Sequence, residues 1–152
     1  MGKRSIADYN LIYGQIEIDE YNQLDGVIDV DLEEKYAINR DILFDPLTLI
    51  DIPKVIESCT KEWQNHSLCT VNDCVIRLGV IHGEFHWHKH DDEDEFFYVI
   101  DGQLLIDLDE KSVNLEPGQG FLVPKGILHR TRAPKRTSIL MVEGSEVMPT
   151  GD

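Results

Sequence analysis

Cysteine and basic residues are both scarce in this chain. It has 3 cysteines, Cys59, Cys69 and Cys74, and an odd number favours free thiols over a disulfide framework. It has 14 Lys and Arg residues against 29 Asp and Glu residues, which gives a net charge of −15. A nucleic-acid-binding protein neutralises phosphates with Lys and Arg, so this balance predicts no nucleic-acid partner.

Long hydrophobic runs are absent as well. No run approaches the roughly 20 apolar residues of a membrane helix, so we expect no membrane partner. The opening MGKRSIADYN has two basic residues but no apolar stretch behind them, unlike a secretory signal, and we expect a cytoplasmic protein. Neither a G-x-S-x-G elbow nor a phosphate-binding glycine loop occurs, which argues against serine hydrolases and nucleotide-dependent enzymes.

The chain is long enough for one domain, and its character changes near residue 50. Residues 1–50 are acidic and weakly patterned, apart from an Asp-Gly turn followed by alternating residues at 25–31, which is a hairpin signal. We predict an N-terminal arm or accessory strands over 1–50 and a β-barrel domain over 51–152. Asp51 and Pro53 stand where a helix cap and an early helical proline belong, so a short helix is expected there.

Short β-prone runs follow one another from residue 72 onward, separated by Gly, Pro and Asp turn signals. Many short strands at even spacing are typical of an all-β sandwich or barrel. A basic cluster over 130–136 could attract an anionic substrate, but we favour a solvated turn. The predicted strands are 74–81, 85–90, 95–100, 104–108, 121–123 and 139–142, and the basic cluster comprises Arg130, Arg132, Lys135 and Arg136.

Four residues have the types and spacing of metal ligands. Side chains two apart on a strand share a face, so His88 and His90 would lie about 7 Å apart on one side of the predicted strand. The acidic turn 91–94 then brings Glu95 back toward them, and His129 follows the turn at 124–126. Imidazoles with one carboxylate suit a single divalent Fe, Mn, Ni, Zn or Cu ion better than Ca or Mg. The alternative is a histidine-rich strand that binds metal only adventitiously.

The remaining histidines carry weaker predictions. His86 lies two residues before His88, so on the predicted strand it would share a face with His88 and His90. It is therefore predicted to hydrogen-bond a metal ligand or to touch a substrate. A histidine satisfied within the core or at its rim is an equal alternative. His66 and His82 lie outside the pattern, and we expect them to be surface or packing residues.

The spacing of these residues resembles the two motifs of the cupin superfamily. The resemblance spans 63–152 and implies a cupin double-stranded β-helix, or jelly-roll, barrel. The chain looks most like small single-domain cupins that are often labelled mannose-6-phosphate isomerase-like, a label that reflects the barrel and does not transfer a reaction. The first motif is approximated by Gly83, His88, His90, Glu95 and Gly102, and the second is matched by Gly118, Pro124, Gly126 and His129, with Ala133 where the family has Asn.

The expected function is metal-dependent chemistry on a small molecule. An ion that prefers six ligands and receives four from the protein keeps about two positions for a substrate or dioxygen, which favours an enzyme of dioxygenase or isomerase type. The alternative is a non-catalytic cupin that binds or senses a small ligand, and no catalytic residue is assigned. A small open barrel also leaves strand edges that need cover, and cupins habitually pair, so we expect a homodimer.

Overall fold

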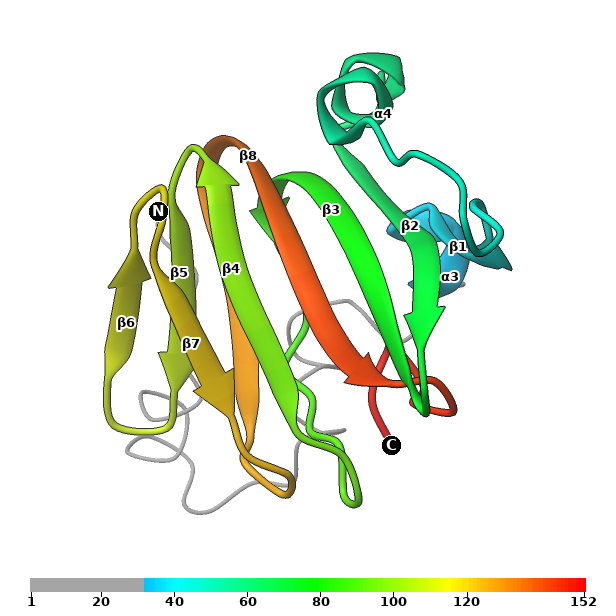
Figure 1. The fold of residues 1–152 in the computed structure, drawn as a ribbon. Coiled ribbons are helices and arrows are strands. Elements are labelled where there is room, and N and C mark those ends of the chain that lie inside the picture. The colour runs from blue at the N-terminus through cyan, green and yellow to red at the C-terminus, as the bar shows by residue number, and fades with distance from the viewer. Residues whose placement is uncertain (1–31) are drawn as a thin grey trace.

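The computed structural model describes residues 32–152, and Figure 1 shows a curled β-sheet with short helices at one side. The hairpin predicted at 25–31 lies outside the described residues. The described elements in chain order are α3 (Leu32–Lys35), β1 (Ile38–Ile42), α4 (Ile52–Ser58), β2 (Trp63–Val71), β3 (Cys74–Glu84), β4 (Glu95–Asp101), β5 (Leu104–Leu108), β6 (Ser112–Leu115), β7 (Gly120–Val123) and β8 (His129–Gly144).

Strand β8 holds the sheet together. Its first residues pair with β5, as at His129 opposite Leu108. Farther along it pairs with β3 on one side and β4 on the other, so that Val142 lies between Ile76 and Phe96. The main path of the sheet is β1-β2-β3-β8-β4-β7, and β5 carries β6. Because one strand belongs to both parts, the sheet closes around a core, as the orange ribbon between β3 and β4 illustrates (Figure 1).

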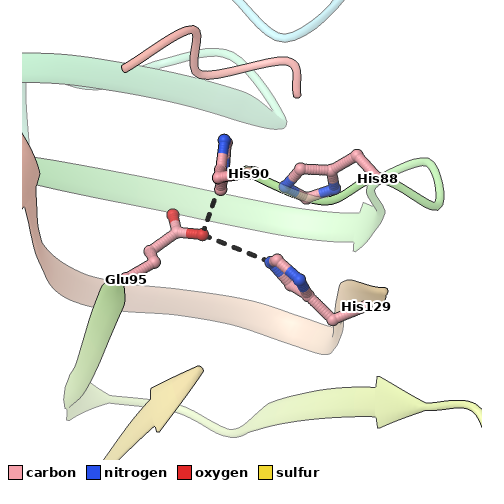
Figure 2. A group of neighbouring side chains, drawn as sticks. All are labelled: His88, His90, Glu95 and His129. Carbon is pink, nitrogen blue, oxygen red and sulfur yellow. Dashed lines mark hydrogen bonds and ion pairs between the residues drawn. The ribbon is translucent and has the colours of Figure 1, made fainter. Parts of the chain in front are cut away.

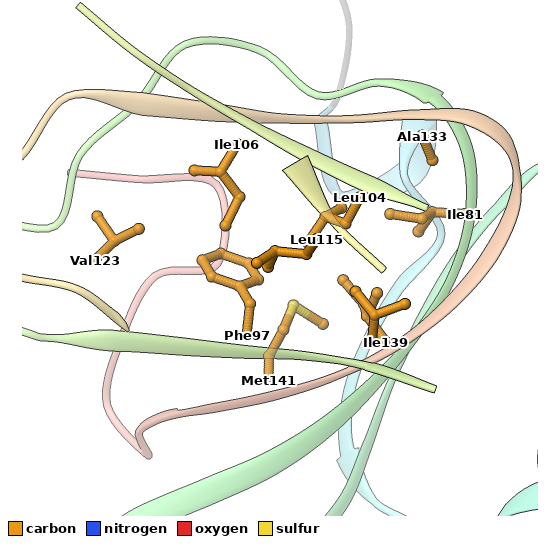
Figure 3. Packing of buried hydrophobic residues seen from close by; sticks show 10 residues of the cluster. Ile81, Phe97, Leu104, Ile106, Leu115, Val123, Ala133, Ile139 and Met141 are labelled. Carbon is orange, nitrogen blue, oxygen red and sulfur yellow. The ribbon is translucent and has the colours of Figure 1, made fainter. Parts of the chain in front are cut away.

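Alternation along the strands builds that core. In β4, Phe97 and Val99 are buried while Phe96 and Tyr98 are exposed, as a period of two requires. Figure 3 shows the Phe97 ring surrounded by the other inward side chains. Burial of each large apolar side chain contributes about 1.5–3 kcal/mol. The buried members of this cluster are Ile81, Phe97, Val99, Leu104, Ile106, Leu115, Val123, Ala133, Ile139 and Met141.

The expected short helix is confirmed as α4. The Asp51 carboxylate accepts a hydrogen bond from the Lys54 backbone N–H at 3.2 Å and so caps its first turn. Val55 and Ile56 pack from this helix toward a second buried cluster that contains Leu68 and Leu78. Within residues 32–152, no helix has the length and apolar character required to cross a membrane.

The all-β barrel is confirmed, but several of its strands differ from the predicted runs. The predicted runs at 74–81, 95–100, 104–108 and 121–123 fall in β3, β4, β5 and β7. The run at 139–142 is only part of β8, which begins at His129. Strands β2 and β6 were not expected, because neither Trp63–Val71 nor Ser112–Leu115 has a clean apolar alternation.

The predicted strand at 85–90 is wrong. A bulge between Ile81 and Gly83 disturbs the pairing of β3 with β8 just before it. Afterwards the segment keeps only scattered contacts to β8, from the Phe85 N–H to the Thr131 carbonyl and in both directions between His88 and His129. The alternating sequence resembles a strand, but the backbone lacks the continuous ladder that a strand needs.

The favoured solvated turn for the basic cluster is wrong as well. Its residues lie along β8, and Arg130 is only 5% exposed. Asp107 of β5 explains this burial, because its carboxylate accepts hydrogen bonds from Arg130 at 2.8 Å and from Arg132. These two charges are therefore used inside the fold, and only the later part of the cluster faces solvent.

Candidate metal centre

The fold gathers His88, His90, Glu95 and His129 at one point (Figure 2). One ligand atom from each residue lies within 4.8 Å of the others, and all four residues are buried, with exposures of 6%, 2%, 6% and 1%. His88 and His90 come from the irregular segment after β3, while Glu95 and His129 begin β4 and β8. The predicted grouping is thus present, although it does not arise from two histidines on one regular strand.

Glu95 is the centre of the group. Its Oε2 lies 3.2 Å from His129 Nε2 and 3.3 Å from His90 Nε2, the contacts drawn as dashed lines in Figure 2. The His88 ring centroid lies 4.4 Å from that of His129 and 5.0 Å from that of His90. Three imidazoles therefore converge on one carboxylate from different directions.

Backbone carbonyls orient two of the imidazoles. His129 Nδ1 lies 2.9 Å from the Ile127 carbonyl oxygen, and His88 Nδ1 lies 3.1 Å from the His86 carbonyl oxygen. When Nδ1–H donates to such an oxygen, Nε2 carries the lone pair, as a metal ligand must. These contacts fix the rings so that both Nε2 atoms can serve the same ion.

The electrostatics of the group favour an ionised Glu95 carboxylate beside a neutral His88. Burial opposes the Glu95 charge, but the close contacts of its carboxylate with His129 and His90 outweigh it and hold the Glu95 pKa below its ordinary value. Burial, reinforced by His129, lowers the pKa of His88 well below 6.5. Neutral imidazole and ionised carboxylate are the forms that bind metal.

The donor set fits a divalent transition metal. His90 Nδ1 is buried without a hydrogen-bond partner among the described residues, and His90 Nε2 has only the 3.3 Å approach of Glu95 Oε2, although buried polar atoms are nearly always paired. A cation within the cluster would satisfy one of them. Three nitrogens and one carboxylate oxygen match the preferences of Fe, Mn, Ni, Zn or Cu, so the cluster can hold such an ion.

The other histidines stand apart from the cluster. His86 Nε2 lies 2.6 Å from the Thr150 carbonyl oxygen, and its ring lies 5.2 Å from the His88 ring. Burial lowers its pKa to about 4, against the raising effect of the Thr150 contact. The structure thus joins His86 to the segment after β8, and its predicted contact with a substrate stays a prediction. His66 and His82 lie on β2 and β3, outside the cluster.

A buried ion pair beside the cluster escaped the sequence analysis. Arg77 Nε donates to Glu143 Oε1 at 2.6 Å and Arg77 Nη1 donates to the Ser67 hydroxyl at 2.6 Å. Burial and the charge of Glu95 raise the pKa of Glu143 well above 4.5, and Arg77 opposes this. The alternation of inward and outward residues along the strands could have revealed this pair. Arg77 shares the inward face of β3 with Ile81, and Glu143 shares the inward face of β8 with Met141.

A cavity adjoins the cluster. His88 and Glu95 form part of its wall, and Pro149, from the segment after β8, closes another part. The space open to water-sized molecules is about 30 Å³, which is room for about two waters. A group bound to an ion in the cluster would extend into this cavity.

Comparison with known proteins agrees with this architecture. Residues 76–143 match the family model described as Cupin domain. An 80-residue segment is 48% identical to the uncharacterized protein YdbB of Bacillus subtilis, covering 52% of this chain and 71% of that protein.

Solved structures share the fold. A cupin-2 domain protein from Shewanella frigidimarina superposes with a TM-score of 0.61 at 29% identity, over 63% of this chain and 94% of that one. A protein from Neisseria meningitidis gives a TM-score of 0.58 at 21% identity, over 64% and 99% of the two chains. The curled sheet, the matching family model and these relatives together place the chain in the cupin superfamily.

Proposed function

We propose that this protein binds one divalent transition-metal ion, Fe, Mn, Ni, Zn or Cu, through His88, His90, Glu95 and His129, and acts with it on a small molecule. The observation that carries the proposal is the convergence of four buried ligand atoms within 4.8 Å of one another, one of them from His90, whose Nδ1 has no hydrogen-bond partner within residues 32–152 and whose Nε2 meets only the Glu95 carboxylate. Without an ion, one carboxylate oxygen is the shared partner of two buried imidazoles, an arrangement that a cation would satisfy better.

The bound ion would supply Lewis acidity, or a position for dioxygen, next to the cavity. The chain itself would supply orientation and exclusion of water. The carbonyls of His86 and Ile127 hold two ligand rings in place, and the buried Phe97 ring of the apolar core lies 6.3 Å from that of His129. This arrangement supports an enzyme of dioxygenase or isomerase type.

Metal analysis tests the binding step. Protein purified without added metal and then loaded with one ion at a time should reach about one equivalent, as measured by plasma mass spectrometry. The His82→Ala variant is the matched control, since this side chain is 49% exposed and lies outside the cluster. A stoichiometry near zero with every ion would contradict the proposal.

Oxygen uptake by the Fe(II)-loaded protein with small-molecule substrates tests the reaction type. Uptake that depends on both the metal and a substrate supports a dioxygenase. Conversion of a substrate without uptake supports an isomerase. Ligand binding without turnover would instead support the alternative function, a non-catalytic protein that binds or senses a small ligand.

A further inference from the structure

The cavity beside the metal cluster has a mostly apolar wall. Its large apolar side chains are Trp63, Ile81, Phe85, Phe97, Ile139 and Met141, and Pro149 adds to them. Such a wall favours the apolar body of a small molecule. With room for about two waters in its present form, the cavity suits a ligand of only a few non-hydrogen atoms.

The charges around the cavity disfavour anions. No Lys or Arg belongs to the described lining, whereas Glu95 and Glu143 both do. The buried cation Arg77, which contacts the lining residue Glu143, already donates to Glu143 at 2.6 Å and to Ser67. In the metal-free protein, a phosphate or carboxylate in the cavity would lie against two acidic side chains with no free cation from the wall, and buried charge needs a partner.

Asn65 provides a polar contact that the fold leaves unused. Its side chain belongs to the cavity wall, and the residue is only 8% exposed. Its backbone N–H donates to Ala37, and the pairing of β1 with β2 opposite Ile38 fixes its position. Its Oδ1 is buried without a hydrogen-bond partner in the part of the chain that the structure describes. An unpaired buried acceptor is costly, and a donor on a ligand would satisfy it.

We propose that the metal cavity binds a small uncharged alcohol, whose apolar part lies against the aromatic wall and whose hydroxyl donates a hydrogen bond to Asn65 Oδ1. This inference names the ligand class of the proposed metal site and rests on it. Asn65 is then a specificity-determining residue. It favours a hydroxyl over a group of the same shape without a donor, and in the metal-free protein the acidic wall disfavours the corresponding anion.

Three molecules of four non-hydrogen atoms each provide the test. 2-Propanol has a donor, acetone has the same skeleton without one, and acetate has a similar shape with a negative charge. Their binding is measured by NMR titration of the ¹⁵N-labelled full chain, both metal-free and loaded with Zn(II), by following the Asn65 side-chain amide and the Gly79 backbone amide, since both residues line the cavity.

2-Propanol should bind about tenfold more tightly than acetone, the usual effect of one hydrogen bond, and acetate should bind more weakly still in the metal-free protein. Asn65→Leu should abolish the preference for 2-propanol over acetone. Asn65→Asp, which keeps an acceptor of similar shape, should retain it. Asn114→Leu carries the same change at an exposed position outside the lining and should leave the preference intact.

Equal binding of 2-propanol and acetone by the unmodified chain would overturn the inference, and so would tighter binding of acetate in the metal-free protein. These outcomes differ from failure of the proposed function. A protein that takes up Zn(II) but shows no alcohol preference refutes only the ligand class. A protein that takes up no metal but prefers 2-propanol refutes only the metal site.

Discussion

Glu95 and Glu143 stand directly opposite each other on β4 and β8, and both are buried. Like charges at paired positions of a sheet repel each other. Burial and this repulsion raise the pKa of Glu143, and the two side chains have different partners, because Arg77 binds Glu143 at 2.6 Å while His129 and His90 approach Glu95. Glu95 is therefore the carboxylate left for a cation among the histidines, which agrees with its proposed role as a metal ligand.

Loss of a proposed ligand should reduce metal content without unfolding the barrel. His88→Ala or His129→Ala removes one of four donors, whereas neither residue belongs to the apolar cluster that stabilises the fold. Affinity should fall by more than the roughly 10–100-fold caused by losing an outer hydrogen bond, and Glu95→Gln should act more weakly because an oxygen remains. Metal analysis with circular dichroism checks this, and unchanged stoichiometry in both histidine variants would refute the ligand set.

Acidification should release the metal. Histidine binds metal only when neutral, and its ordinary pKa is about 6.5. Burial lowers the pKa of His88 in the folded protein. As the pH falls, the histidines of the unfolded chain therefore take up protons before His88 of the folded protein does. Metal occupancy and the thermal midpoint should therefore fall together from about pH 7 to about pH 5. Occupancy that stays flat down to about pH 4 would exclude histidine as the main ligand type.

The two cupin-like motifs allowed the cluster and the barrel to be predicted, since ligand types and turn residues are local features. Pairing partners are not local. The alternation at 85–90 resembles a strand, but only the bulge near Gly83 and the irregular contacts to β8 decide its backbone. The Arg77–Glu143 pair joins residues 66 apart in sequence, and only the register of β3 with β8 brings them together.

Asp107 should be a major stabilising residue. Its buried carboxylate accepts hydrogen bonds from Arg130, Arg132 and Ser112. Asp107→Asn should lower the free energy of unfolding by about 3 kcal/mol, since it leaves buried guanidinium charge without its partner. Asp109→Asn, at an exposed position of similar sequence context, should change it by less than about 0.5 kcal/mol. Urea denaturation at pH 7 measures both, and equal effects would contradict this role.

The same carboxylate predicts an acid-dependent loss of stability. Burial would raise its pKa, but the hydrogen bonds from Arg132, Ser112 and Arg130 outweigh this and lower the pKa of Asp107 from 3.8 to about 2. A carboxyl whose pKa is lower in the folded state stabilises the fold above its unfolded pKa and loses that contribution as pH falls toward its folded pKa. The free energy of unfolding should therefore decline less steeply below pH 3.8 in Asp107→Asn than in the unmodified protein.

A homodimer remains our expectation, and the outer face of the sheet offers a place for it. Phe96, Tyr98 and Leu122 lie there with exposures of 38%, 38% and 51%, and Phe96 pairs directly with Leu122. Light scattering should give twice the mass of one chain, and the double variant Phe96→Ser with Leu122→Ser should shift the measured mass toward that of the monomer.

Deletion of residues 1–50 tests the dimer at a second place, because it removes β1 from the edge of β2. The shortened chain is expected to be monomeric or to aggregate. A monomeric unmodified protein at micromolar concentration would refute the dimer.

The turn between β4 and β5 should tolerate only glycine at position 102. Gly102 has φ +94°, and a Cβ there would lie 2.7 Å from Thr137 Cα, part of the backbone of β8. Gly118 has φ +84°, but a Cβ there would meet nothing within 4 Å. Gly118→Ala should therefore cost only the backbone strain, about 1–2 kcal/mol. Gly102→Ala should cost about 1–3 kcal/mol more, because a strand backbone cannot move aside as a flexible side chain can. Urea denaturation of the two variants separates strain from overlap, and equal losses would mean that β8 adjusts to the added methyl group.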